Sequence, residues 1–107
     1  MTHRENVLNR LGFPTTLHMS LHMLAIHTHT PLEALQEVYN RGIGAWKTNP
    51  QSVRLKKDFS KNPDTSKFPR SARLTKEQWA YARVYSFLDK GTDYYTADKD
   101  IAEKYHI

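Results

Sequence analysis

Basic residues are concentrated in one part of the chain, between Arg41 and Lys76. Ten basic residues stand there against two acidic ones (10 − 2), so this stretch has a formal charge of +8, whereas the whole chain carries +5. A stretch of this kind attracts polyanions and can neutralise the phosphates of a nucleic acid. The ten residues are Arg41, Lys47, Arg54, Lys56, Lys57, Lys61, Lys67, Arg70, Arg73 and Lys76.

Three aromatic residues, Trp46, Phe59 and Phe68, are interspersed among these cations. Aromatic rings beside a basic track are typical of proteins that hold single-stranded nucleic acid without base specificity. We therefore predict a non-enzymatic binding protein that contacts DNA or RNA through every basic residue named above except Lys76. Two alternatives stay open: the cations keep a solvated loop soluble, or neighbouring protein subunits order the loop.

His18 and His22 are four residues apart, and on one helix face they could reach the same metal ion. The glutamate of the metalloprotease motif is missing, because Met19 follows His18. Asp98 and Asp100 could together hold a divalent cation. We predict instead that the histidines are packed or surface residues and that the protein uses no metal or other cofactor. A metal-dependent enzyme would depend on these few residues.

Arg83 is four residues from both Trp79 and Phe87, so on a helix aromatic rings partly enclose its guanidinium. A cation that is partly removed from water requires a carboxylate partner. We predict a structural ion pair of Arg83 with Asp98 and Asp100.

Other catalytic chemistry has no support in the residues. The chain has no cysteine, which excludes a thiolate nucleophile, cysteine zinc ligands and a disulfide framework, and fits a reducing compartment. No serine–histidine–acid set can be argued, and Gly42-Ile43-Gly44 matches no nucleotide-binding fingerprint. We predict that the protein is not an enzyme.

The stretch 74–91 predicts the central helix of the fold, over residues 75–89. Thr75 and Gln78 form a capping box at its start, and Gly91 is a stop signal at its end. Apolar residues cover about half of the helical wheel, and Tyr81 and Tyr85 extend over the other half. A helix that is apolar on most sides packs against several neighbours.

Four further helices are predicted, over about 2–11, 15–26, 30–41 and 96–105. Their start and stop signals are a capping box of Thr2 and Glu5, glycine at Gly12, a threonine–proline start at Thr30-Pro31, and glycine at Gly42. Residues 42–73 are predicted to form a long irregular basic loop that begins with a turn at Trp46.

The second and third predicted helices are joined by a short turn and resemble a helix-turn-helix. Glutamine and asparagine on the third helix could pair with adenine, but two glutamates would then face phosphates. A structural helical hairpin is the preferred interpretation, and a DNA-reading third helix is the alternative. The face in question holds Glu33, Gln36, Glu37, Asn40 and Arg41.

A length of 107 residues with 38% hydrophobic residues fits a single domain over 1–107 with a modest core. The most apolar run, residues 17–26, contains two histidines and has about half of the ~20 residues that a membrane helix requires. The sequence therefore predicts a small all-α domain, a helical bundle of about five helices that does not enter a membrane.

Three segments together resemble a known family. They are Val-Tyr-Asn-Arg-Gly-Ile-Gly-Ala-Trp-Lys-Thr at 38–48, Gln-Trp-Ala-Tyr-Ala-Arg-Val-Tyr-Ser-Phe at 78–87, and Asp-Lys-Asp at 98–100. They resemble a small uncharacterised domain of tailed bacteriophages and of large DNA viruses of algae, over roughly residues 24–100. That domain has no assigned activity, so the resemblance implies no catalytic residues. It implies a viral protein that acts in the host cell cytoplasm or in the virion, with a partner there.

Overall fold

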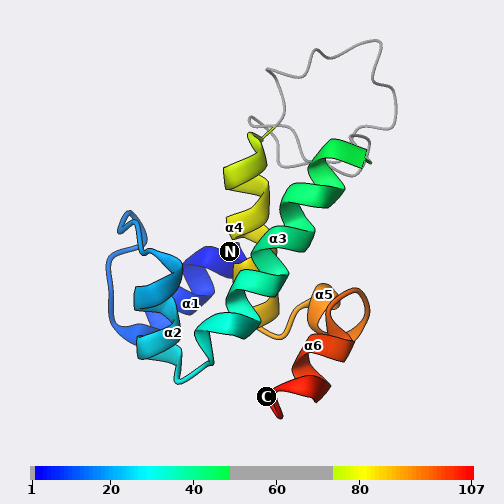
Figure 1. Ribbon diagram of the computed structural model, residues 1–107. Coiled ribbons are helices and arrows are strands. Elements are labelled where there is room, and N and C mark those ends of the chain that lie inside the picture. The colour runs from blue at the N-terminus through cyan, green and yellow to red at the C-terminus, as the bar shows by residue number, and fades with distance from the viewer. Residues whose placement is uncertain (1, 49–73) are drawn as a thin grey trace.

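The computed structural model describes residues 2–48 and 74–107, and every regular element in these two ranges is a helix. Figure 1 shows their arrangement, and the all-α prediction is confirmed. The described part has six helices where about five were predicted, and α5 is a single turn. The bounds are α1 His3–Leu11, α2 Leu21–Thr28, α3 Leu32–Thr48, α4 Lys76–Leu88, α5 Thr92–Tyr95 and α6 Lys99–Lys104.

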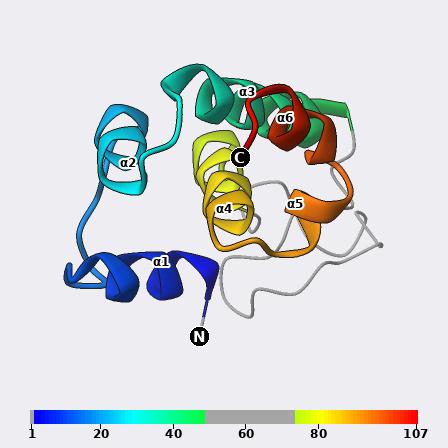
Figure 2. The same ribbon diagram turned by 90° about the horizontal axis from the view of Figure 1, so that it is seen from below.

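The central position predicted for the fourth helix is confirmed. Thr75 and Gln78 form the reciprocal capping box, and Asp89 ends the helix. Figure 2 shows α4 surrounded by α1, α2, α3 and the α5–α6 pair. Residues on several sides of α4 are therefore buried, and they are Ala80, Val84, Tyr85, Ser86 and Phe87.

The first helix forms from the signals that the sequence carries. The Thr2 hydroxyl accepts from the Glu5 amide, and the Glu5 carboxylate accepts from the Thr2 amide. Gly12 ends α1 in the left-handed conformation, with φ of 81°, where glycine is favoured because it lacks a Cβ. Val7 and Leu8 on its inner face are buried in the core.

The predicted start of the second helix is wrong. Residues 15–16 form a turn and 17–20 are not helical, so α2 begins at Leu21 with Ser20 as its cap. The Ser20 hydroxyl accepts from the Met23 amide at 3.2 Å. Arg4 of α1 donates to the Leu17 carbonyl at 2.9 Å and thereby fixes the preceding segment to another helix. This tertiary contact accounts for the late start.

The predicted end of the third helix is also wrong, because α3 continues through Gly42 and Gly44 to Thr48. A Cβ at Gly42 would lie 2.7 Å from the Cα of Ala80. Gly42 therefore allows the α3 and α4 backbones to approach closely, and it is buried within the helix. Trp46, where a turn was predicted, therefore lies within α3.

The two glycines of α3 provide a matched pair of substitutions. Gly42→Ala is expected to lower the free energy of unfolding by about 1–3 kcal/mol, because the added Cβ meets the α4 backbone. Gly44→Ala is expected to raise it by about 0.5–1 kcal/mol, because nothing lies within 4 Å of its Cβ position and alanine favours the helix. Urea unfolding followed by circular dichroism measures both. Two changes of the same sign would contradict the close approach of α3 and α4.

The last predicted helix begins later than expected. Residues 96–98 form a turn, so α6 is shorter than the predicted 96–105, and α5 lies before the predicted range. Ile101 and Ala102 of α6 are buried, and α6 packs against α3 (Figure 2). None of the helices in the described ranges is long and apolar enough to cross a membrane.

Candidate nucleic-acid interface

Most of the ten basic residues between Arg41 and Lys76 lie in residues 49–73, named the basic stretch below, and Thr48 and Leu74 are the described residues that flank it. The indole Nε1 of Trp46 donates to the Leu74 carbonyl at 2.7 Å, so a hydrogen bond links the end of α3 to the residues that precede α4. Lys47 and Lys76, which flank the stretch, are both exposed. The helical body thus presents both ends of residues 49–73 at one end of the molecule (Figure 1).

Most of the predicted nucleic-acid contacts lie in that stretch, outside the described residues. They are Arg54, Lys56, Lys57, Lys61, Lys67, Arg70 and Arg73.

Arg41 is a correction to the predicted interface, because its guanidinium is bound within the protein. It donates to both carboxylate oxygens of Asp100, at 2.8 and 2.6 Å, and to the Ala97 carbonyl at 3.0 Å. This bidentate contact lowers the pKa of Asp100 to about 2 and raises that of Arg41. Arg41 therefore links α3 to the start of α6, and its guanidinium already has acceptors within the protein.

Arg83 and Asp98 form the predicted ion pair. Arg83 donates from Nε and Nη2 to the two Asp98 oxygens, at 3.0 and 2.9 Å. The Asp98 side chain is fully buried, and Arg41 Nη1 lies 3.6 Å from it. Asp100, the other predicted partner of Arg83, bonds to Arg41 instead. Two arginines from α3 and α4 therefore hold the segment that leads into α6.

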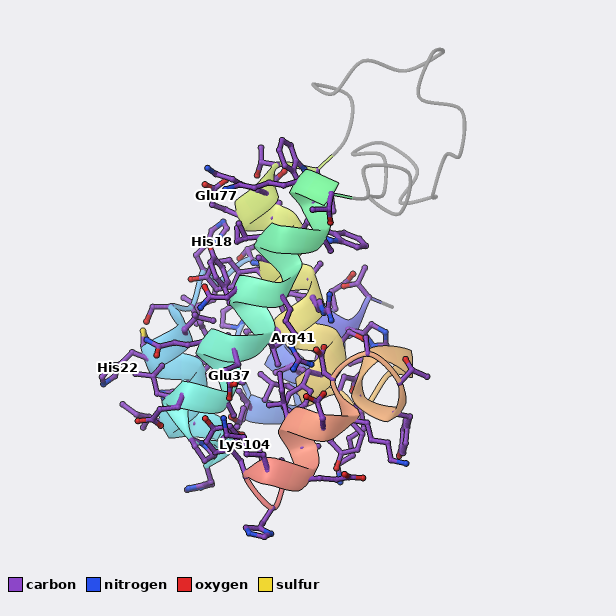
Figure 3. The ribbon with its side chains drawn as sticks, turned by 45° about the vertical axis from the view of Figure 1, so that its right-hand side comes forward. His18, His22, Glu37, Arg41, Glu77 and Lys104 are labelled. Atoms are coloured by element: carbon purple, nitrogen blue, oxygen red, sulfur yellow. The ribbon has the colours of Figure 1, made fainter. Side chains whose placement is uncertain are left out.

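The face of α3 that would read DNA in a helix-turn-helix is partly covered by α6. Lys104 of α6 lies 3.3 Å from the Glu37 carboxylate, beside the Arg41–Asp100 pair (Figure 3). Glu33, Gln36 and Asn40 stay exposed. This arrangement favours the interpretation of α2 and α3 as a structural hairpin.

The histidine pair that could have bound a metal is not on one helix face. His18 precedes α2, whereas His22 is in its first turn, and Figure 3 shows the two side chains well apart. Within residues 2–48 and 74–107, no group of three histidine or carboxylate side chains is placed to hold a metal ion.

A polar cluster that the sequence analysis missed joins α1 to the end of α4. The Asp89 carboxylate lies 2.8 Å from His3 Nδ1 and accepts from the side-chain Nδ2 of Asn6 at 3.0 Å. Arg10 lies 3.4 Å from the same carboxylate and also donates to the Leu88 carbonyl at 3.1 Å. No local signal identifies this cluster, because Asp89 lies more than 70 positions from His3, Asn6 and Arg10 in the chain.

This cluster predicts a pH-dependent contribution to stability. Burial raises the pKa of Asp89, but His3, Asn6 and Arg10 outweigh it and hold that pKa below its usual value. A carboxyl group with a depressed pKa stabilises the fold above its unfolded pKa of about 4, and the contribution is lost as the pH falls through the folded value. Asp89→Asn should therefore lower the free energy of unfolding by about 1–2 kcal/mol at pH 7, and by a smaller amount at pH 3.

Urea unfolding at the two pH values measures this difference, and Glu103→Gln, which changes an exposed carboxylate, is the control. An equal effect of Asp89→Asn at both pH values would contradict the assignment.

No family model, curated protein or solved structure matches the chain. The resemblance to the viral domain stays a prediction, and the functional argument depends on the charges and contacts of the chain itself.

Proposed function

We propose that the protein binds nucleic acid through phosphate contacts made by the basic residues between Thr48 and Leu74, with Lys47 and Lys76 at the two ends. The supporting observation is the segregation of charge. Residues 49–73 hold seven basic and two acidic residues (7 − 2 = +5), which equals the net charge of the whole chain. The remaining residues hold nine basic and nine acidic ones, so the rest of the chain is formally neutral.

Several charges of the helical body are paired with one another. Cations and carboxylates from different helices are matched in pairs, and these are Arg10 with Asp89, Arg41 with Asp100, Arg83 with Asp98, and Lys104 with Glu37. Carboxylates that already have partners are poor acceptors for the additional cations of residues 49–73. This supports a partner for the basic stretch outside the chain.

The attachment of the stretch supports the same proposal. The Trp46–Leu74 hydrogen bond and the close approach of Gly42 to Ala80 hold the neighbouring ends of α3 and α4 together. The seven basic residues of the basic stretch lie within one segment that is joined to the body at both ends. Their high local concentration favours contact with several phosphates of one strand. The proposed setting is viral, as the sequence resemblance implies.

Chemical footprinting of the lysines tests where nucleic acid binds. A bound single-stranded oligonucleotide should reduce acetylation of Lys56, Lys57 and Lys61, and should leave Lys90 and Lys99 on the body unchanged, as measured by mass spectrometry. Equal protection of both groups would contradict the proposal. No protection, with a fixed copy number of the protein in purified virions, would favour a structural partner instead.

A further inference from the structure

A cavity of about 650 Å³ lies between the first turn of α1, residues 15–20 and the first half of α4. This volume is in the range of small-ligand sites. Leu74, whose carbonyl accepts the Trp46 hydrogen bond, is one of the residues that line the cavity. Figure 3 shows His18 and Glu77, which both line it, at the end where α4 begins.

One part of the cavity wall is aromatic and apolar. Tyr81 and Tyr85 of α4 line it together with Met19. Tyr85 and Met19 are 3% and 4% exposed, and Tyr81 is held by an edge-on contact with Tyr39 of α3, with ring centroids 5.2 Å apart. Packing therefore fixes this wall. Tyr81 is only partly buried, so a planar ligand could lie against the Tyr81 ring.

Another part of the wall offers both hydrogen-bond donors and acceptors. Arg4 is held by its bond to the Leu17 carbonyl. The Gln78 side-chain oxygen accepts from the Thr75 amide at 2.9 Å, which leaves its NH₂ group as a donor toward a ligand. Glu77 supplies a carboxylate acceptor. The polar groups around the cavity thus carry both signs of charge.

This mixture discriminates between classes of ligand. A free phosphate would be repelled by Glu5 and Glu77, and an aliphatic chain would desolvate Glu77 without offering it a hydrogen-bond donor. A nucleobase has an aromatic face that suits the aromatic part of the wall, and an edge with donors and acceptors that suits the polar part. We propose that the cavity accepts one unstacked base of a single-stranded nucleic acid whose phosphates contact the basic stretch. The inference rests on the proposed function.

Amide chemical shifts of the unmodified chain test the inference. A single-stranded oligonucleotide should shift the amides of Met19, Gln78 and Ala82 in a saturable titration. Inorganic polyphosphate is the matched probe without bases, and it should shift amides of the basic stretch while leaving these three unchanged.

Two substitutions of alanine by phenylalanine provide a matched pair. Ala82→Phe fills the cavity and should weaken oligonucleotide binding at least about fivefold, because base stacking contributes about 1–3 kcal/mol per base. The dependence of affinity on salt should not change, since the phosphate contacts stay. Ala97→Phe, at an exposed position on the α5–α6 side, should leave affinity unchanged.

The outcomes separate this inference from the proposed function. Salt-sensitive oligonucleotide binding without shifts at the cavity, or with unchanged affinity of Ala82→Phe, would overturn the inference and leave the proposed function standing. Failure of the oligonucleotide to bind at all would remove both. Should Ala82→Phe fail to fold, the comparison of oligonucleotide with polyphosphate on the unmodified chain decides.

Discussion

Replacement of Asp98 by alanine is expected to lower the free energy of unfolding by about 3–5 kcal/mol, because it leaves a largely buried arginine without its carboxylate. Asp98 is fully buried and accepts two hydrogen bonds from Arg83, whose side chain is 13% exposed. The pair joins the centre of α4 to the residue that precedes α6. Loss of the carboxylate should therefore also loosen the packing of α6 on α3.

Asp100→Ala is the matched control for this substitution. Asp100 is two residues away and also binds an arginine, but its side chain is 67% exposed, so its removal should have a much smaller effect. The double substitution Arg83→Met with Asp98→Leu should recover most of the stability lost in Asp98→Ala, because it removes both buried charges together. Urea unfolding at neutral pH measures all three variants. Equal losses in Asp98→Ala and Asp100→Ala would contradict the account of the buried pair.

Neutralisation of two lysines in the basic stretch is expected to weaken nucleic-acid binding strongly. With Lys56→Gln and Lys57→Gln together, the log–log slope of affinity against salt should fall in magnitude by about 1.4–1.8, which is roughly twenty-five- to sixtyfold in affinity near ~0.1 M salt. The reason is that each cation in contact with a phosphate releases condensed counterions. Fluorescence anisotropy with a labelled oligonucleotide measures both quantities.

The control for this prediction changes the net charge by the same amount elsewhere. Lys90 and Lys99 are exposed on the helical body, at the end of α4 and the start of α6. Replacing both by glutamine should leave the slope unchanged if binding is local to the basic stretch. An equal loss in the two double variants would show that only net charge matters.

Local sequence signals were sufficient to predict where a helix begins when its cap is formed by neighbouring residues of the same segment. Thr2 with Glu5 and Thr75 with Gln78 form capping boxes in the structure as predicted, because each box needs only residues three apart. The apolar surface of the central helix could also be predicted, because the spacing of apolar residues along a helix indicates which faces are buried.

Tertiary contacts decided the positions that sequence reasoning misjudged. A glycine at position 42 resembles a helix stop in the sequence. In the structure it lies within α3, and its lack of a side chain permits the close contact with Ala80. His18 and His22 have helical spacing, but the Arg4–Leu17 hydrogen bond holds the residues before Leu21 outside the helix. Neither partner is near in sequence, so no local pattern could reveal it.

The same distinction applies to the candidate sites. Arg83 was identified because its aromatic neighbours lie within its own helix. Arg41, by contrast, was assigned to nucleic acid by its place in a basic run, and its bond to Asp100 spans 59 positions of the chain. The cavity beside Tyr81 and Tyr85 is built from three separate segments, and no motif in any of them indicates it.

The salt dependence of nucleic-acid affinity in the unmodified chain tests the central claim most directly. Binding of a single-stranded oligonucleotide should weaken steadily between about 50 and 200 mM salt, with a log–log slope of about −0.7 for each phosphate neutralised. A measurable slope of several units is the result that a separate cationic stretch on a neutral body predicts. Absence of binding at the low-salt end, or an affinity that salt does not change, would contradict it.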